Sequence, residues 1–233
     1  MTDPAGPSAD AAAAVIAIID DHQLITASLS AALDGQGYSV VVPALTDVAQ
    51  VTGQLTDVQP TVALLDLDLG GFGSGEDLLP VLLEMRTRVL MVSATDDDAT
   101  IGRCLQAGAW GWVPKSSSLE VLLGALVKAA AGQPVLDEHT RADLIGVWRR
   151  RQASLAESLA PFERLSNREA VVLGLLVAGR SAERIATDSF VSIATIRTQI
   201  RAILLKLGTN SQLEAVALAN QVGWHPPKVK EQG

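Results

Sequence analysis

Short apolar runs alternate with longer stretches of helical spacing along the first 130 or so residues. The runs predict five strands, at residues 15–19, 39–42, 61–66, 89–93 and 111–113. The stretches between and after them predict five helices, at residues 24–33, 48–55, 78–85, 98–107 and 119–131. Strand-then-helix units of this kind form a parallel sheet covered by helices on both faces. The pattern therefore predicts an α/β, doubly wound five-stranded domain.

The remainder of the chain has a helical pattern without strands. Four short helices are predicted, at residues 169–178, 182–187, 194–207 and 213–222. The third carries one apolar stripe, made of Ile196, Ile200, Ile203, Leu204 and Leu207. Short helices joined by tight turns are typical of a helix-turn-helix arrangement, so we expect a small all-α second domain.

These patterns divide the chain into five parts. We expect a disordered leader at 1–14, an α/β domain at 15–132, a partly helical linker at 133–163, a helical domain at 164–223 and a tail at 224–233. The leader is rich in Ala, Pro, Ser and Asp and has no Lys or Arg, so it does not resemble a secretory signal. The linker helix, expected over 138–152, ends on three arginines that either reach toward DNA or form a solvated face.

Composition adds a cellular setting. Hydrophobic residues make up 48% of the chain and charged residues 19%, as in globular proteins. The single cysteine, Cys104, cannot form an internal disulfide and is expected to be a small buried residue on a helix. No apolar stretch reaches the roughly 18 residues that a membrane span requires. We therefore expect a cytoplasmic protein.

Charge is distributed unevenly between the two parts. Residues 1–163 hold 9 Lys+Arg and 21 Asp+Glu, which gives −12, whereas residues 164–233 hold 9 and 5, which gives +4 and a total of −8. An acidic first part joined to a basic second part indicates that only the second meets a polyanion such as DNA.

Polar residues follow the strands of the α/β domain at one edge. Asp20 and Asp21 end the first strand, Asp66 the third and Ser93 the fourth, and Lys115 follows the fifth. Ligands of such sheets bind at the carboxyl ends of the strands. Neighbouring carboxylates repel one another unless a cation lies among them, and Mg²⁺ suits such oxygen ligands. Asp66 could then attack a phosphoryl donor, with a hydroxyl and an ammonium group to bind the product.

The motifs around these residues resemble the receiver domain of response regulators, which has a flavodoxin-like topology. They are Ile-Asp20-Asp21-His, Leu-Leu-Asp66-Leu-Asp-Leu, Val-Ser93-Ala and Gly-Ala-Trp-Gly-Trp112-Val-Pro-Lys115, and the resemblance spans residues 15–131. It implies that Asp66 is the phosphoacceptor and that Asp20, Asp21, Asp66 and the main-chain carbonyl of Asp68 bind Mg²⁺.

The same resemblance implies that Ser93 and Lys115 bind the phosphoryl group. Trp112 then stands at the family's switch aromatic, although plain packing is the alternative for this residue. One departure is Gly70, which replaces a usual proline in a glycine-rich segment, residues 70–75. A phosphate-cradling loop is conceivable there, but the segment lacks the Lys-Ser/Thr ending of a nucleotide loop, and a flexible loop is the better interpretation.

Residues 164–222 resemble the LuxR-type helix-turn-helix, and the whole chain resembles the NarL/FixJ family of response regulators. The residues that carry this are Leu165-Ser166-Asn-Arg168-Glu169, Val172-Leu173, Gly179-Arg-Ser181, Ile185-Ala186, Val191-Ser192, Thr195-Ile196-Arg197-Thr198-Gln199-Ile200-Arg201, Leu204, Lys206-Leu207-Gly208 and Glu214-Ala215-Val216. The resemblance makes Arg197, Thr198 and Arg201 candidates to face bases, and Thr195 and Lys206 candidates to face phosphates. Gln199, Arg184, Asp188 and Phe190 depart from the family pattern, so a target sequence cannot be taken over from relatives.

The resulting hypothesis is a transcription regulator, not an enzyme, that a histidine kinase or a small phosphodonor phosphorylates on Asp66. The phosphorylated form is expected to bind double-stranded DNA, released from inhibition or as a homodimer. Three alternatives remain open: an adaptor or phosphate sink that acts through protein contacts, a constitutive DNA binder, and a Mg²⁺-dependent hydrolase using the same acidic cluster.

Overall fold

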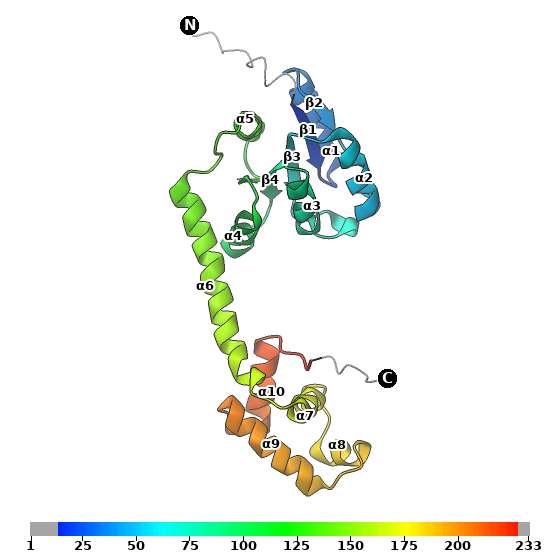
Figure 1. Cartoon of the computed structure of the whole chain (residues 1–233), viewed down its shortest axis with the longest axis vertical. Helices are drawn as coiled ribbons and strands as arrows, with labels where there is room; N and C mark the ends of the chain where they lie inside the picture. Colours follow the sequence, from blue (N-terminus) through cyan, green and yellow to red (C-terminus); the bar gives the residue numbers. More distant parts are fainter. Residues whose placement is uncertain (1–13, 228–233) are drawn as a thin grey trace. The chain divides into compact units, whose positions relative to one another are not determined.

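The structure is a computed structural model that describes residues 14–227. The expected disordered leader, apart from Ala14, and the last six residues of the expected tail lie outside the described part. The chain forms two compact units, residues 1–149 and 150–233, and the boundary falls within one helix, α6 (Figure 1).

The first unit alternates strands and helices as the pattern predicted. Its strands are β1 (Val15–Ile19), β2 (Ser39–Val41), β3 (Val62–Asp66), β4 (Arg88–Ser93) and β5 (Gly111–Pro114). Its helices are α1 (Gln23–Asp34), α2 (Val48–Val58), α3 (Leu79–Glu84), α4 (Asp98–Ala107) and α5 (Leu119–Ala130). Two 3₁₀ turns, η2 (Gly70–Phe72) and η3 (Gly75–Leu78), precede α3, and η3 includes Leu78, the first residue of the expected third helix.

The five strands form one parallel sheet in the order β2-β1-β3-β4-β5. The order reverses beside β1, since the chain first moves outward to β2 and then returns to β3 on the other side. Ile19 of β1 pairs with Leu65 of β3, so the residue after each, Asp20 and Asp66, emerges at the same sheet edge. This confirms the doubly wound α/β fold.

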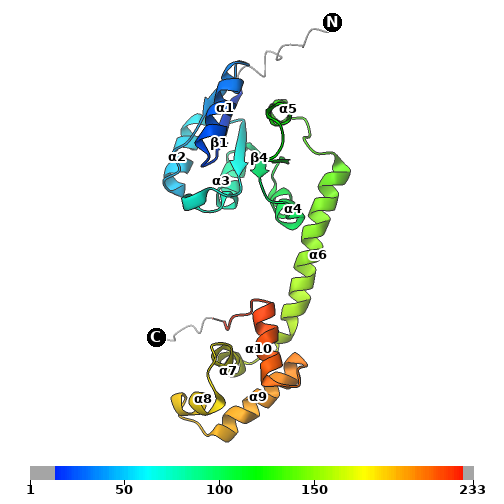
Figure 2. The ribbon, with the colours of Figure 1, turned by 180° about the vertical axis from the view of Figure 1, so that it is seen from behind.

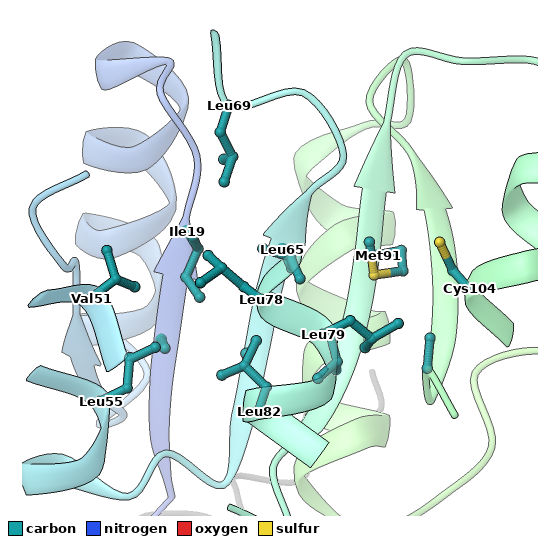
Figure 3. Packing of buried hydrophobic residues seen from close by; sticks show 14 of the residues in the cluster. Ile19, Val51, Leu55, Leu65, Leu69, Leu78, Leu79, Leu82, Met91 and Cys104 are labelled. Carbon is teal, nitrogen blue, oxygen red and sulfur yellow. The ribbon is translucent and has the colours of Figure 1, made fainter. Parts of the chain in front are cut away.

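Helices cover both faces of the sheet, because the strand side chains alternate in direction. On one face, Ile19, Leu65 and Met91 pack against α2, α3 and α4, as Figure 3 shows. On the other face, the alternate strand residues pack against Leu29 of α1 and Leu126 of α5. Cys104 lies in the first of these clusters, 2% exposed, as expected for a small buried residue on a helix.

Helix α6 differs from its prediction. It runs from Glu138 to Glu163, well beyond the expected end at residue 152, and contains Pro161. The prediction failed because the two halves of α6 pack into separate cores with an exposed stretch between them. Leu144 and Ile145 pack against the α/β core, and Phe162 packs into the core of the second unit. Residues 149–157 are exposed, so the apolar stripe is interrupted along the helix.

The second unit contains four further helices, shown from behind in Figure 2: α7 (Asn167–Val177), α8 (Ala182–Asp188), α9 (Ile193–Leu207) and α10 (Gln212–Gln221). Their N-caps are serines, at positions 166, 181, 192 and 211, and each accepts a backbone hydrogen bond from the first turn. Ile196, Ile200, Ile203 and Leu207 of α9 are buried in the shared core, and Leu204 is partly buried beside it. The apolar stripe predicted for this helix is confirmed.

Within residues 14–227, none of the helices combines the length and the apolar character that crossing a membrane requires.

Candidate functional site

The carboxyl edge of the sheet brings together the polar residues predicted to meet there. Asp66, the last residue of β3, is 3% exposed, and Asp20, which follows β1, is 8% exposed. Lys115, directly after β5, reaches both: its Nζ donates to Asp66 Oδ2 and lies 3.1 Å from Asp20 Oδ2. A cavity of about 480 Å³ opens beside Asp66, with Ser93 and Lys115 among its lining residues.

His22 joins this group, although the sequence interpretation gave it no role. Its Nδ1 lies 3.0 Å from Asp20 Oδ1 and 2.7 Å from Asp21 Oδ1. Ligand atoms of Asp20, Asp21, His22 and Asp66 all lie within 4.8 Å of one another. Asp20 Oδ2 is buried and makes no hydrogen bond, and the Lys115 ammonium is the cation beside it. This is a donor set of the kind that holds a hard divalent cation.

The environment shifts the protonation of these groups. Burial raises the pKa of the Asp66 carboxyl, because the charged form loses water, and the hydrogen bond from Lys115 only partly opposes this. Burial acts to lower the pKa of Lys115, but hydrogen bonds to Asp66 and Asp20 outweigh it and the pKa is raised. The hydrogen bond to Asp20 raises the pKa of the His22 imidazole. Lys115 is thus a fixed cation against two carboxylates.

Ser93 ends β4, the strand next to Asp66, and Trp112 lies within β5, one strand further along the sheet. Ser93 is 5% exposed, and its Oγ accepts a hydrogen bond of 2.9 Å from the Thr95 backbone, so its hydroxyl proton is available for another acceptor. Trp112 on β5 packs at the margin of the α2–α3–α4 core, and its indole Nε1 is buried without a hydrogen bond. A buried N–H without an acceptor is costly, which sets Trp112 apart from an ordinary packing residue.

The loop after Asp66 is built from turns. Asp68 N donates to Asp66 Oδ1 at 3.3 Å, and Asp68 Oδ1 accepts from Gly70 N at 3.0 Å. Gly70 has a φ of +57°, and a Cβ there would lie 2.5 Å from Asp21 Oδ2. Gly75 is constrained by backbone rather than by a side chain, since its Cβ would lie 1.9 Å from the Asp66 carbonyl oxygen. Glycine at these two positions therefore has steric reasons beyond loop flexibility.

Glu76 and Arg103 form an ion pair beside the same cavity. The sequence interpretation gave neither residue a role. The Arg103 guanidinium donates to Glu76 Oε1, and Glu76 is one of the residues that line the cavity next to Asp66. Their positions in the sequence, on η3 and α4, carry no signal that would place them together.

The second candidate surface is the outer face of α9. Thr195, Arg197, Thr198 and Arg201 are all exposed there, opposite the buried stripe. The helix has no acidic residue. An exposed face of threonines and arginines on the longer helix of a helix-turn-helix has the chemistry that reads base edges and phosphates.

Two of the predicted DNA-contacting cations have partners within their own unit. Arg197 Nη2 lies 3.6 Å from Glu183 Oε1, and both side chains are largely exposed. Lys206 Nζ donates to Glu169 Oε2 at 2.6 Å, and Glu169 also accepts from Ser166 N in a capping box. Lys206 thus ties α9 to the start of α7, while Arg197 holds a weaker surface pair.

Two departures from the family pattern compensate for each other. Arg184 Nε lies 3.1 Å from Asp188 Oδ1, one turn along α8, and Arg180 also reaches Asp188 at 3.0 Å.

Phe190 lies in the turn before α9 with a φ of +54° and is 97% exposed. Of the arginines that end the expected linker helix, Arg149 donates to Gln106 Oε1 at 2.9 Å.

Two family models match the chain. Residues 16–127 match the response regulator receiver domain, and residues 163–219 match the luxR family of bacterial regulatory proteins. The matches coincide with the α/β domain and the helical domain, and together they span both candidate surfaces.

Curated relatives cover nearly all of the chain. The probable transcriptional regulatory protein NarL of Mycobacterium tuberculosis is 32% identical over 205 residues, which is 88% of this chain and 92% of that protein. The DNA-binding transcriptional activator DevR/DosR of the same organism is 29% identical, over 88% of this chain and 93% of its own length. The transcriptional regulatory protein LiaR of Bacillus subtilis is 25% identical, over 88% and 96%.

Solved structures with a similar chain include the RcsB–DNA complex, at 22% identity and a TM-score of 0.49, covering 90% of this chain and 99% of that one. Another is the response regulator ChrA of a heme-sensing two-component system, at 25% identity and a TM-score of 0.45, covering 90% of this chain and 98% of that one.

The two domain matches and the similarity to NarL show that this chain belongs to the NarL/FixJ family of two-component response regulators. It is a transcriptional regulator made of a receiver domain and a LuxR-type helix-turn-helix DNA-binding domain.

Proposed function

We propose that Asp66 is the phosphoacceptor and that its phosphorylation controls DNA binding by α9. The observation that carries this proposal is the position of Asp66: a buried carboxylate at a strand end, held by the ammonium of Lys115 and opposite Asp20. One of its oxygens attacks the phosphorus atom of a donor, and the bond from phosphorus to the leaving group breaks as that group departs with its electron pair. The donor is a histidine kinase or a small acyl phosphate.

Ser93 and Lys115 would then bind the phosphoryl group. Lys115 already lies against Asp66, so it supplies a positive charge without travelling far. The Ser93 hydroxyl lines the same cavity and donates to a phosphoryl oxygen. We propose that Ser93 moves toward the phosphoryl group and that Trp112 follows into the space it leaves next to β5. The buried indole N–H of Trp112, which has no acceptor, supports this role.

The acidic cluster fits Mg²⁺ as the cation of this site. Asp20, Asp21 and Asp66 supply carboxylate oxygens within 4.8 Å of one another, and Asp20 Oδ2 is buried without a hydrogen bond. The main-chain carbonyl of Asp68 is our fourth proposed ligand. Bound Mg²⁺ would offset the negative charge that the carboxylates and the incoming phosphoryl group bring together.

An intact-mass experiment tests the phosphorylation. After incubation with acetyl phosphate and Mg²⁺, the wild-type chain should gain one phosphoryl group, and Asp66→Asn should gain none. Chelating the metal should abolish the gain. Well-folded wild-type protein that remains unmodified with every donor would contradict the phosphorylation switch and favour a constitutive DNA binder.

For DNA binding, we propose that Arg197, Thr198 and Arg201 face bases and that Thr195 and Lys206 face phosphates. The exposure of the first four on one face of α9 supports this. Lys206 is the weakest member, because its ammonium already holds Glu169. On contact with DNA, Arg197 would exchange its surface pair with Glu183 for a base edge.

Charge variants test this surface. Arg197→Ala and Arg201→Ala should each weaken binding to a preferred duplex by about 1–3 kcal/mol and relax its sequence preference. Arg184→Ala, on α8 and paired with Asp188, is the control for losing one surface arginine. Unchanged gene regulation after reversing the charge of Arg197 and Arg201 would favour the adaptor or phosphate sink instead.

We further propose that the phosphorylated chain acts as a homodimer in the cytoplasm, with one α9 in each of two half-sites about one helical turn apart. Sedimentation of the phosphorylated and unphosphorylated chain tests the assembly. A phosphorylated chain that stays monomeric while its DNA affinity rises would replace dimerisation by release of an inhibited domain.

A further inference from the structure

The first half of α6, residues 138–149, belongs to the receiver unit and contacts α4 and the segment between α4 and β5. The Arg141 guanidinium donates to the carbonyls of Leu105 at 3.0 Å, Ala109 at 2.9 Å and Trp110 at 3.1 Å. The first two lie at and just beyond the C-terminal turn of α4, where carbonyls have no partner within the helix. Arg141 therefore caps α4 from a neighbouring helix.

The contact between the two helices depends on Gly102 in the middle of α4. A Cβ at this position would lie 2.0 Å from the Leu144 carbonyl oxygen and 3.1 Å from Trp148 Cβ. The nearest atoms belong to the backbone of α6, so they cannot move aside without moving the helix. A glycine in a helix interior costs about 1 kcal/mol relative to alanine. The close approach of α6 is what that glycine permits.

Arg103, the next residue on α4, connects α6 to the phosphorylation cavity. Its guanidinium pairs with Glu76, which lines the cavity together with Asp66, and its Cζ lies 5.6 Å from the centre of the Trp148 ring on α6. One cation is thus shared between a carboxylate at the cavity and an aromatic face on the linker helix.

We propose that residues 138–149 form a phosphorylation-responsive surface of the receiver, and that Arg103 couples their docking to the charge in the phosphorylation cavity. The inference rests on the proposed phosphorylation of Asp66. A phosphoryl group adds negative charge to the cavity that Glu76 lines, which draws the Arg103 guanidinium inward and away from Trp148. The docked half of α6 then loosens. Because α6 continues to residue 163, the loosening of its first half links the charge at Asp66 to the helix that leads into the DNA-binding unit.

Coupling of this kind is reciprocal: if phosphorylation loosens α6, then loosening α6 favours the phosphorylated form. Gly102→Ala tests that direction, because it expels α6 while improving the helix propensity of α4. Gly124→Ala is its matched control, since Gly124 lies within α5 and a Cβ there meets no atom within 4 Å. Arg103→Met removes the shared cation and keeps much of the side-chain length.

Hydrogen–deuterium exchange of the full chain measures the docking, with and without beryllofluoride and Mg²⁺ as the phosphoryl mimic. In the wild type and in Gly124→Ala, exchange of residues 138–149 should rise about fivefold or more with the mimic. In Gly102→Ala it should be fast already without the mimic, and beryllofluoride should bind about fivefold more tightly. In Arg103→Met the mimic should bind but leave the exchange of α6 unchanged.

An equal exchange rate of residues 138–149 with and without bound mimic in the wild type would overturn the inference. So would a response of Arg103→Met that equals the wild-type response. Intact mass after acetyl phosphate treatment of the same samples separates the two proposals. A phosphorylated chain with an unresponsive α6 refutes only the coupling, whereas a chain that takes up neither phosphoryl group nor mimic refutes the proposed function as well.

Discussion

Gly70 and Cys104 show how single residues acquire their chemistry from their surroundings. Gly70 has the left-handed φ that glycine adopts most readily, and it lies against the Asp21 carboxylate. Cys104 is enclosed in the α2–α3–α4 core, and burial raises the pKa of its thiol to about 12. The first residue shapes a proposed metal site, and the second is removed from chemistry altogether.

Gly70→Ala should weaken Mg²⁺ binding by about tenfold, the lower end of the effect seen when a group that supports a metal ligand is changed. The added Cβ would lie 2.5 Å from Asp21 Oδ2, and this carboxylate can rotate away at little cost to folding. Calorimetric titration with Mg²⁺ measures the affinity. Gly71→Ala is the control, because a Cβ at Gly71 meets no atom within 4 Å. Equal affinities for the two variants would show that Gly70 does not position Asp21.

Cys104 should resist alkylation in the folded chain at about pH 8, because the thiolate is the nucleophile and is almost absent well below its pKa. Labelling with iodoacetamide, followed by mass spectrometry, measures the rate. The denatured chain is the reference and should be labelled readily. Rapid labelling of the native chain would mean that the α2–α3–α4 core opens often.

At the scale of elements, the start of α7 and the end of α9 are joined by charge. Glu169 accepts from Ser166 N and from Lys206 Nζ, both at 2.6 Å. Burial acts to raise the pKa of this carboxyl, but these hydrogen bonds outweigh it, and the pKa lies below its usual range. The ion pair therefore stabilises the arrangement of the two helices.

Glu169→Gln should lower the free energy of unfolding of the helical domain by about 1.5–3 kcal/mol, the range for hydrogen bonds to charged groups. The lowered pKa sets the pH dependence. The contribution of Glu169 is complete above the unfolded pKa, near 4.3 for glutamate, and is lost as pH falls toward the lower folded value. Urea unfolding of the full chain, followed over this pH range, measures both effects.

Glu214→Gln is the control for this prediction, because Glu214 accepts a backbone hydrogen bond from Asn210 at 2.8 Å at the start of α10. It should cost less than Glu169→Gln at neutral pH. If the two variants lost equal stability, the Lys206 pair would add nothing beyond the cap.

The sequence predicted most elements because buried parallel strands appear in it as continuous apolar runs, and amphipathic helices as apolar residues at helical spacing. It also predicted that Asp20, Asp66, Ser93 and Lys115 would meet, since parallel strands present their carboxyl ends at one edge. It could not predict the pairing of Arg103 with Glu76, which depends on how α4 packs rather than on any local pattern. The length of α6 was missed for a related reason, because its apolar residues serve two cores.

For the molecule as a whole, the main feature is the difference in net charge between its two parts. The composition predicts this difference, and the two domain matches explain it. The receiver side, with the linker, carries −12 and the DNA-binding side +4. DNA binding by a protein of net charge −8 must therefore come from a local basic face, and its dependence on salt should reflect the contacts of that face alone.

The salt dependence of DNA binding should distinguish dimerisation from release of inhibition. If phosphorylation brings two α9 helices onto one duplex, the slope of log affinity against log salt should about double, because phosphate contacts double. If it only frees the domain, affinity should rise with the slope unchanged. Fluorescence anisotropy between about 50 and 200 mM salt, using a duplex selected by the chain from a randomised pool, measures the slope.

The core of the helical domain includes residues that lie outside its family match. Phe162 of α6 stacks on Trp224 with ring centroids 5.3 Å apart, and a Cβ on Gly174 of α7 would lie 2.8 Å from Pro226 Cγ. The match spans only residues 163–219, so both rings of that stack fall outside it. A fragment cut to those bounds would expose one side of its own core. A self-sufficient DNA-binding fragment of this chain has to begin upstream of Phe162 and extend at least to Pro226.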